Sequence, residues 1–507
     1  MNSINEKIEK MRFNLMNLIP PKAKMGYTMN KEKQQKVLLQ CTIILLLVIG
    51  AAALMVQGIP KKYDLLYTLR RSDPILQYYL GVNQADDSTE ATSDYVLKDD
   101  KSLYNLNDIT EVTVLLLEVH TAEEYSLSDL ESPDIAENLK LPVVIREGTA
   151  QGTVKWEGFG YDAMAPNATI EVKGVPKENR KYHNFKIRLK NVAGRYEGQT
   201  IINLKKGYGK PCRAEEKFAF DLFASLPDMM SLRTEFVHVY VKNADAPSPY
   251  YESYGIYTLV EQPDENYFLN RSLDTSANMY QAENFSFRKE DVLLDISDPD
   301  YNKKAFETVL DIKQGTSHTD LLAAIDAVNN RNKDIDEVIE EHFNRDNVFT
   351  WMAMNVILGN QDVATKGYLL YKPLMSSVWF FLPANMSETM WAVSQESLME
   401  EGIDGCVVFE GNLLYERILK SPENRQELTD RVDELMQYFS EGTVENLTNQ
   451  YIVVLSQYLA VNPDKGILKD TPDQVIANIS RYYEIMQYNV SVFEEKWILN
   501  TNEKEKK

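Results

Sequence analysis

The feature that most constrains this chain is an uncharged, apolar run of 22 residues at positions 37–58, VLLQCTIILLLVIGAAALMVQG. A helix of that length, at about 1.5 Å per residue, spans the roughly 30 Å hydrocarbon core of a bilayer. A cleaved signal peptide is the alternative, since Ala51, Ala52 and Ala53 would suit a signal peptidase. However, the 36 residues before the run exceed a usual basic leader, which favours an uncleaved signal anchor.

The distribution of charge predicts how this anchor is oriented. Residues 1–36 contain eight Lys or Arg and three Glu, a balance of +5, and the whole 507-residue chain carries −22, so residues 59–507 carry −27. The positive excess before the span places the N-terminus in the cytoplasm and the bulk of the chain outside. The sequence therefore predicts a single-pass protein of the cell membrane, and its acidic balance argues against nucleic acid as a partner.

Composition excludes two further classes of protein. A hydrophobic content of 44% provides for a folded core, which excludes a chain that is disordered throughout. Three cysteines are too few for a disulfide framework or a Cys-rich zinc site. Cys41 lies in the apolar run, so Cys212 and Cys406 are the only external pair, and we expect two buried thiols there.

Hydrophobic periodicity predicts an α+β fold, with a β-rich first half and a helix-rich second half. Alternating segments predict strands at 111–119, 141–147, 152–159, 168–174, 185–190, 200–206, 236–243 and 255–262. A helix is predicted at 214–226, and longer helices at 304–328, 334–358, 412–439, 444–461 and 471–497. The predicted domains are a basic cytoplasmic N-terminus at 1–36, the anchor at 37–58, an acidic linker at 59–104, a β-rich region at 105–167, the main domain at 168–500 and a charged tail at 501–507.

An ordered series of segments runs through the main domain. It reads FKIRLKN, INLKKGYGKP, EEKFAFDLF, GIYTLVEQPDENYFLNR, NVFTWMAMNVILGNQD and YERILKSPENRQEL, and its most specific positions are Gly255, Tyr257, Val260 and Glu261. The series resembles the CotH kinase family, secreted atypical relatives of the protein kinases that are named for a spore-coat protein. The resemblance covers residues 168–500 and implies a two-lobed, kinase-like external domain.

On the nucleotide side, the chain departs from the family pattern. The resemblance assigns Gly174, Lys181 and Glu261 as a remnant of nucleotide binding, but Tyr182 and His183 stand where family lysines are expected. A histidine in such a strand is typical of packing, so we expect a structural His183. Glu215 and Glu216 also stand where the family has Arg-Asn; they are hostile to a phosphate but suit a helix N-terminus.

On the metal side, Asp362 fits the catalytic Asp of the family, and Asn360 fits the residue before it. The Asn expected a few residues later is missing from the stretch 364–368. Asn385 and Ser387 stand where the family has metal-binding carboxylates, which removes up to two negative charges from a Mg²⁺ site. Glu388 lies one residue further on and substitutes for them only after a shift of register.

These departures predict a pseudokinase without catalytic residues, metal or cofactor, which acts as a scaffold or binding subunit of a cell-envelope assembly. Its expected partners are the membrane and other envelope proteins; by family analogy, the assembly belongs to a spore coat or an exopolysaccharide system, with the polysaccharide as a further partner. One alternative is an active kinase or nucleotidyl transferase that uses Asp362 and Glu388 with ATP and Mg or Mn. The other is a carbohydrate- or protein-binding module.

For the binding module, the aromatic candidates lie around one Pro-containing loop, at Tyr250, Tyr251, Tyr254 and Tyr257. The plain interpretation of that cluster is strand packing followed by a loop.

Overall fold

The computed structural model describes residues 95–97, 99–104, 111–132, 139–174, 181–207, 213–248, 250–273, 275–390 and 409–504. They belong to one compact unit, Glu90–Lys507. The predicted span at 37–58 and all three cysteines lie outside these ranges. Among the helices inside them, we find none that is both long and apolar enough to cross a bilayer.

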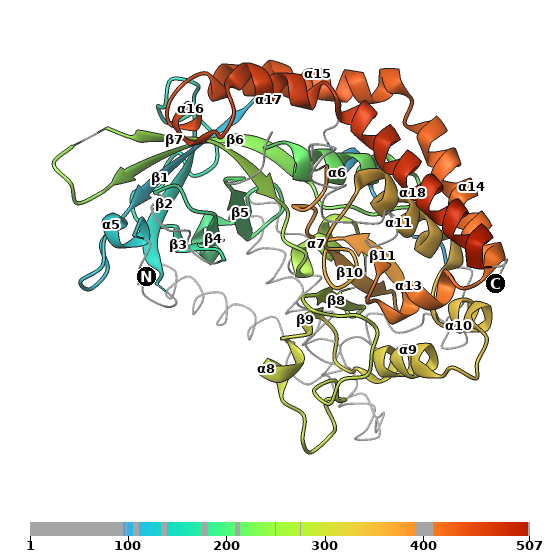
Figure 1. Ribbon diagram of the computed structural model, residues 1–507. Helices are drawn as coiled ribbons and strands as arrows, with labels where there is room; N and C mark the ends of the chain where they lie inside the picture. Colours follow the sequence, from blue (N-terminus) through green and yellow to red (C-terminus); the bar gives the residue numbers. More distant parts are fainter. Residues whose placement is uncertain are drawn as a thin grey trace, which may run out of the picture. The chain divides into compact units, whose positions relative to one another are not determined.

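The first half of this unit is a closed barrel of seven strands in the order β1-β2-β3-β4-β5-β7-β6 (Figure 1). Its strands are β1 (Thr113–Val119), β2 (Leu141–Gly148), β3 (Ala168–Val172), β4 (Phe185–Leu189), β5 (Ile201–Lys205), β6 (Thr234–Asn243) and β7 (Glu252–Val260). The barrel closes because β1 pairs antiparallel with β2 and parallel with β6. Alternate side chains such as Leu115, Leu117 and Ile145 point inward and form its core. The β-rich first half is therefore confirmed.

The strand predicted at 152–159 is wrong. That stretch belongs to the long loop between β2 and β3, where Val154 makes only an isolated bridge to Gly148. Gly152, Glu157 and Gly160 have φ values of 74°, 58° and 66°. These left-handed conformations turn the chain repeatedly and prevent a continuous strand ladder.

A second sheet has the order β11-β10-β8-β9 and is formed by β8 (Asn278–Ala282), β9 (Leu310–Gln314), β10 (Tyr368–Lys372) and β11 (Phe380–Pro383). It contradicts the continuous helix predicted at 304–328. There the chain forms α8 (Lys303–Phe306), then β9, then α9 (Thr319–Asn329). Pairing of β9 with β8, with Ile312 opposite Tyr280, overrides the local helical pattern.

Helices dominate the second half, which is confirmed, although capping residues divide several of the predicted ones. Asn344 caps α11 (Arg345–Leu358) after α10 (Ile335–His342), and Ser421 caps α14 (Pro422–Tyr438) after α13 (Leu413–Ile418). The remaining helices are α5 (Leu127–Leu130), α6 (Glu215–Ser225), α7 (Glu265–Asn270), α15 (Glu441–Leu459), α16 (Asp464–Ile467), α17 (Pro472–Ile479) and α18 (Tyr482–Lys504), with short 3₁₀ turns at Lys101–Leu103 and Asn191–Ala193.

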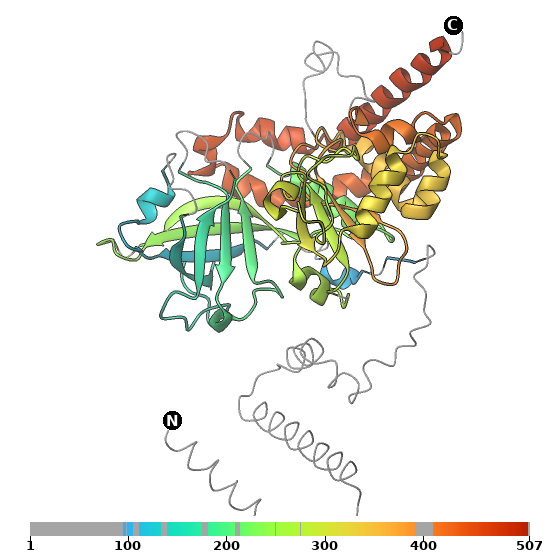
Figure 2. The same ribbon diagram turned by 90° about the horizontal axis from the view of Figure 1, so that it is seen from below.

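The core of the second half lies between the second sheet and α11. This helix contacts β11, α14 and α18, and Figure 2 shows these helices apart from the strands of the barrel. Trp351 of α11 stacks on Phe381 with ring centroids 6.1 Å apart, and its indole N–H donates to the Tyr415 hydroxyl at 3.0 Å. This packing holds the ends of α11 and β11, which carry the candidate site, in fixed positions.

Candidate functional site

The candidate site lies where the end of β5 meets α6 and the end of β11. Lys205, the last residue of β5, forms an ion pair with Glu216 in the first turn of α6. The same Nζ lies 3.5 Å from Oδ1 of Asn385, which follows β11. In protein kinases, a strand lysine and a helix glutamate pair in this way to hold the nucleotide phosphates.

Further ammonium groups gather around Lys205. Lys173, Lys186 and Lys313 come from the ends or edges of β3, β4 and β9. Withdrawal of its ammonium group from water, together with the charges of Lys205, Lys186 and Lys313, lowers the pKa of Lys173 to about 7. Nζ of Lys173 donates to Oδ1 of Asn203 at 3.2 Å. The neighbouring cations, which add to the larger effect of burial, would stabilise an anion bound beside Lys173.

Carboxylates offset part of this positive charge. Glu216 faces Lys205, Asp311 pairs with Lys313, and Glu283 lies close to the same lysines. Burial raises the pKa of the Glu283 carboxyl in spite of the nearby Lys313 and Lys173.

Asp362 lies in the turn that follows α11, next to the loop that carries Asn385. Its carboxylate pairs with Nζ of Lys366 at 3.1 Å, and its backbone N–H donates to the buried Asn360 side chain at 3.1 Å. The carbonyl of Gly367 accepts from the backbone N–H groups of Ala384 at 3.0 Å and Asn385 at 3.3 Å. The structure thus brings the segment of Asp362 and that of Asn385 together.

The donor set at this place does not fit Mg²⁺ well. Mg²⁺ prefers anionic oxygens, whereas Asn385 offers an amide and Ser387 a hydroxyl, and the Asp362 carboxylate already faces Lys366. The backbone carbonyl of Glu388 accepts from Gln361 at 3.0 Å, so Glu388 is placed next to the same turn. Across the described ranges, no three His, Cys, Asp or Glu side chains converge as ligands for a metal ion.

Glu261, assigned to the nucleotide remnant by resemblance, is a buried structural residue. Its carboxylate pairs with Arg271 at 2.9 Å and with Arg233 at 2.9 Å, and the side chains of Glu261 and Arg271 are buried. Burial opposes ionisation, but the two guanidinium groups hold the pKa of Glu261 below its usual value. Arg271 also pairs with Asp99 at 3.0 Å and donates to the Tyr104 hydroxyl at 2.8 Å. The end of the stretch predicted as a linker therefore packs on the folded unit.

Of the other two residues of the assigned remnant, Gly174 follows Lys173 directly, and Lys181 lies in ion pairs with carboxylates. Nζ of Lys181 lies 2.7 Å from the carboxylate of Glu252 on β7 and 3.5 Å from that of Glu131, which follows α5. Gly174 is exposed with φ 79°, and a β-carbon there would have open space. The ring of His183 is buried against the Glu131 carbonyl at 3.2 Å, in agreement with a structural role.

Sequence reasoning missed Lys205, Lys173 and the function of Glu216. From sequence, the N-terminus of the helix is a sufficient explanation for Glu216, because no local pattern shows that Lys205 faces it. The available signal is the Lys205-Lys206 pair within INLKKGYGKP. This pair lies at the end of β5, whereas the resemblance places the family lysines on an earlier strand.

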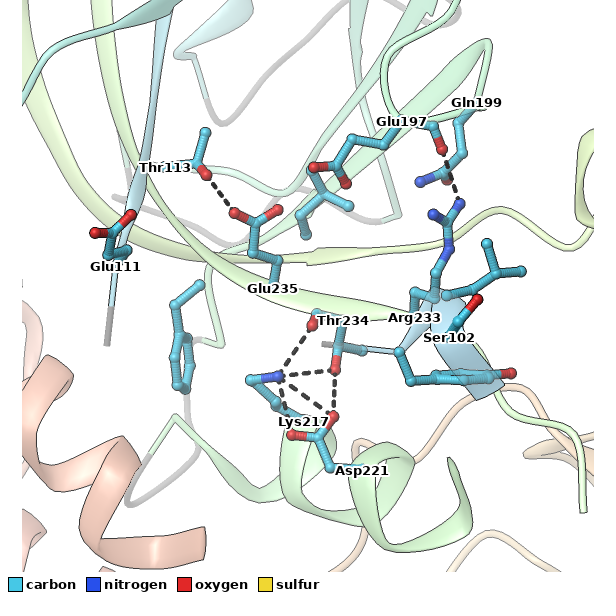
Figure 3. A pocket seen from close by; sticks show the side chains of 14 residues that line it. Ser102, Glu111, Thr113, Glu197, Gln199, Lys217, Asp221, Arg233, Thr234 and Glu235 are labelled. Atoms are coloured by element: carbon cyan, nitrogen blue, oxygen red, sulfur yellow. Dashed lines mark hydrogen bonds and ion pairs between the residues drawn. The ribbon is translucent and has the colours of Figure 1, made fainter. Parts of the chain in front are cut away.

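A cavity of about 430 Å³ lies beside α6, and polar contacts at its wall hold this helix (Figure 3). There Nζ of Lys217 lies 2.9 Å from Asp221 and donates to the Thr234 carbonyl on β6 at 2.9 Å. From α15, the Tyr451 hydroxyl donates to the same oxygen of Asp221, Oδ2, at 2.5 Å. α6 is thereby tied to both the barrel and the C-terminal helices, which keeps Glu216 directed at Lys205.

Comparison with known proteins identifies the family of this chain. The family model described as CotH kinase protein matches residues 170–490, which is more than half of the chain. The matched part includes Lys205, Glu216, Asp362 and Asn385. A search of curated proteins found no match. On the strength of the family match, this chain belongs to the CotH kinase protein family.

Proposed function

We propose that this chain is a membrane-anchored, extracytoplasmic pseudokinase of the CotH family, which binds partners in a cell-envelope assembly and does not transfer phosphate. The observation that carries the proposal is the contrast around Lys205. Its ion pair with Glu216 is complete, whereas the position 3.5 Å away that would hold a metal carboxylate is Asn385.

The charges at this site favour the binding of an anion over phosphoryl transfer. Phosphoryl transfer needs cations on the phosphates and carboxylates that hold Mg²⁺ against them. The lysine cluster of Lys173, Lys186, Lys205 and Lys313 suits an anionic ligand such as the phosphates of a nucleotide. Without anionic oxygens at positions 385 and 387, such a ligand would be held by ammonium groups and not by a metal ion.

The membrane anchor and the expected partners are inferred from the sequence and from the family. The apolar run at 37–58 and the +5 charge before it support a single span with the folded unit outside. A pseudokinase held at a membrane surface is suited to scaffolding, and the family, named for a spore-coat protein, supports a spore-coat or exopolysaccharide assembly as its host.

An active atypical kinase is the second candidate, and the complete Lys205–Glu216 pair favours it. In that case Asp362 would orient the acceptor hydroxyl, Glu388 would assist, and ATP with Mg or Mn would be required. The ion pair of Asp362 with Lys366 would have to open first.

Thermal unfolding and phosphate transfer, measured on the full-length chain in detergent micelles, test the proposal. A ligand that binds only the native state raises the unfolding midpoint by mass action. We expect millimolar ATP to raise the midpoint equally with and without Mg²⁺ or Mn²⁺, with no transfer of the γ-phosphate to any co-purified protein. Transfer that depends on metal and is lost in Asp362→Asn would establish the kinase instead. If ATP causes no shift, the scaffold is retained without a nucleotide.

A further inference from the structure

The long loop between β2 and β3, residues 149–167, holds large apolar side chains in solvent. Trp156 is 78% exposed and Met164 93%, and Tyr161 is 41% exposed. The rings of Trp156 and Tyr161 lie with their centroids 5.3 Å apart and their planes at 56°. Single exposed apolar residues are common on proteins, but a paired Trp and Tyr on one loop with an exposed Met forms a larger apolar surface. We call Trp156, Tyr161 and Met164 the aromatic platform.

The backbone under the platform is held firmly. The side-chain amide of Asn167 accepts from the Ile145 N–H at 2.8 Å and donates to its carbonyl at 3.0 Å. Glu147 donates its N–H to the Phe159 carbonyl at 2.8 Å and accepts from the Phe159 N–H at 3.2 Å through its carboxylate. Gly160 packs so closely on the Ile145 carbonyl that a β-carbon would collide with it. A loop backbone held in place before binding loses little conformational entropy when a ligand arrives.

The loop that carries the platform approaches the cavity beside α6, because Lys155, next to Trp156, pairs with Glu147, and the charge of Glu147 acts on Glu197 and Glu235 of the cavity. Phe159, between the two platform rings in sequence, packs edge-on against Tyr196 with centroids 5.3 Å apart, and the next residue, Glu197, lines that cavity. Two more glutamates line it, Glu111 and Glu235, the latter hydrogen-bonded to Thr113 (Figure 3).

The cavity has an excess of negative charge. Its two basic side chains already have acidic partners, since Lys217 faces Asp221 and Arg233 pairs with Glu261. In the described part of the chain, no ion pair compensates Glu235, and burial together with repulsion from Glu197 raises the pKa of Glu235 to about 7. A positively charged ligand would remove this repulsion.

We propose that the aromatic platform and the cavity that its loop approaches bind a glycan that carries protonated amino groups. One face of a sugar ring presents C–H groups, which pack on the rings of Trp156 and Tyr161, and an ammonium group is attracted both by the ring faces and by the carboxylates of Glu197 and Glu235.

The other classes of partner fit less well. The barrel is closed, so this region has no free strand edge to which a peptide could add. Three exposed side chains are far fewer than the roughly 20–30 residues that each partner contributes to a stable protein interface. An anionic membrane or nucleic acid is disfavoured by the net charge of −22.

Binding of two oligosaccharides to the full-length chain in micelles tests the inference. The probes are a glucosamine oligomer and an N-acetylglucosamine oligomer of the same length, which differ in the charged amine. We expect the glucosamine oligomer to bind more tightly, its affinity to fall with salt, and Trp156→Ala to weaken it about tenfold. Trp156→Phe should retain most of the affinity, and Glu235→Gln should reduce the preference for the amine.

The matched control is Leu374→Ala, an equally simple truncation of an exposed apolar residue in the turn between β10 and β11. It should bind as the unchanged chain does. Equal binding of the two oligomers would overturn the requirement for amino groups, and equal binding by Trp156→Ala and Leu374→Ala would overturn the site. A lysine peptide of equal charge that binds more tightly, and through Trp156, would overturn the glycan in favour of a basic protein segment. None of these results depends on whether the lysine cluster binds ATP.

Discussion

The carboxylate of Asp464, on α16, occupies the space that a β-carbon on Gly255 of β7 would need. It accepts from Nζ of Lys206 at 2.9 Å, from Nη1 of Arg213 at 2.6 Å and from the backbone N–H of Ile256 at 2.8 Å. The glycine that opens the segment GIYTLVEQ, which carries much of the family resemblance, is therefore required by a buried carboxylate from the C-terminal helices.

We expect Gly255→Ala to destabilise the folded unit. Gly255 has φ 75°, so alanine costs about 1–3 kcal/mol in backbone strain, and its β-carbon would displace Asp464 from two buried cations. The unfolding midpoint of the full-length chain measures the effect. Gly174→Ala is the matched control, because φ is 79° there and an added β-carbon would have open space. This variant should show the cost of backbone strain alone. Equal midpoints for the two variants would mean that Asp464 does not restrict position 255.

Arg271→Leu should destabilise the fold by about 3–5 kcal/mol, because Glu261 would keep its charge inside the protein with one of its two partners gone. Chemical denaturation gives the difference in unfolding free energy. For comparison, Arg288→Leu removes the exposed pair with Glu416, which is worth at most about 1 kcal/mol. A small effect of Arg271→Leu would show that the network around Glu261 is not what joins residues 99–104 to the barrel.

Glu235 should make stability depend on pH. Burial and Glu197 raise its pKa from 4.5 to about 7, so the protonated form stabilises the native state fully below pH 4.5, and this contribution is lost as the pH rises through 7. Glu235→Gln is neutral at every pH, and we expect its midpoint to fall less between pH 5 and 7 than that of the unchanged chain. The exposed Glu340→Gln should keep the original pH profile. Parallel profiles for all three proteins would refute the assignment.

Asn385→Asp should create the metal dependence that the natural chain is proposed to lack. A carboxylate at this position, within reach of Lys205, adds an anionic oxygen beside the bound phosphates. We expect Mg²⁺ or Mn²⁺ to increase the thermal shift caused by ATP in this variant, and not in Asn385→Ala, which changes the residue without adding charge. A metal-dependent shift of similar size in the unchanged chain would contradict the explanation based on Asn385.

Local pattern predicted much of the fold. Alternating apolar residues identified the barrel strands, because period-two patterns record which face is buried. The same reasoning failed at 152–159, where left-handed residues bend the chain, and at 304–328, where β9 pairs with β8 in place of continuing a helix. Both failures depend on contacts or backbone angles that residue type alone does not specify.

The sequence by itself determined the apolar run at 37–58, the charge asymmetry, the α+β order and the membership signalled by GIYTLVEQ. Only the tertiary structure decided that Lys205 meets Glu216 and Asn385, that Glu261 is a buried ion-pair partner, and that Trp156 lies in solvent. The reason is physical: periodicity and charge counts are local properties, whereas a site is made by side chains that only the packing of distant segments brings within a few ångströms of each other.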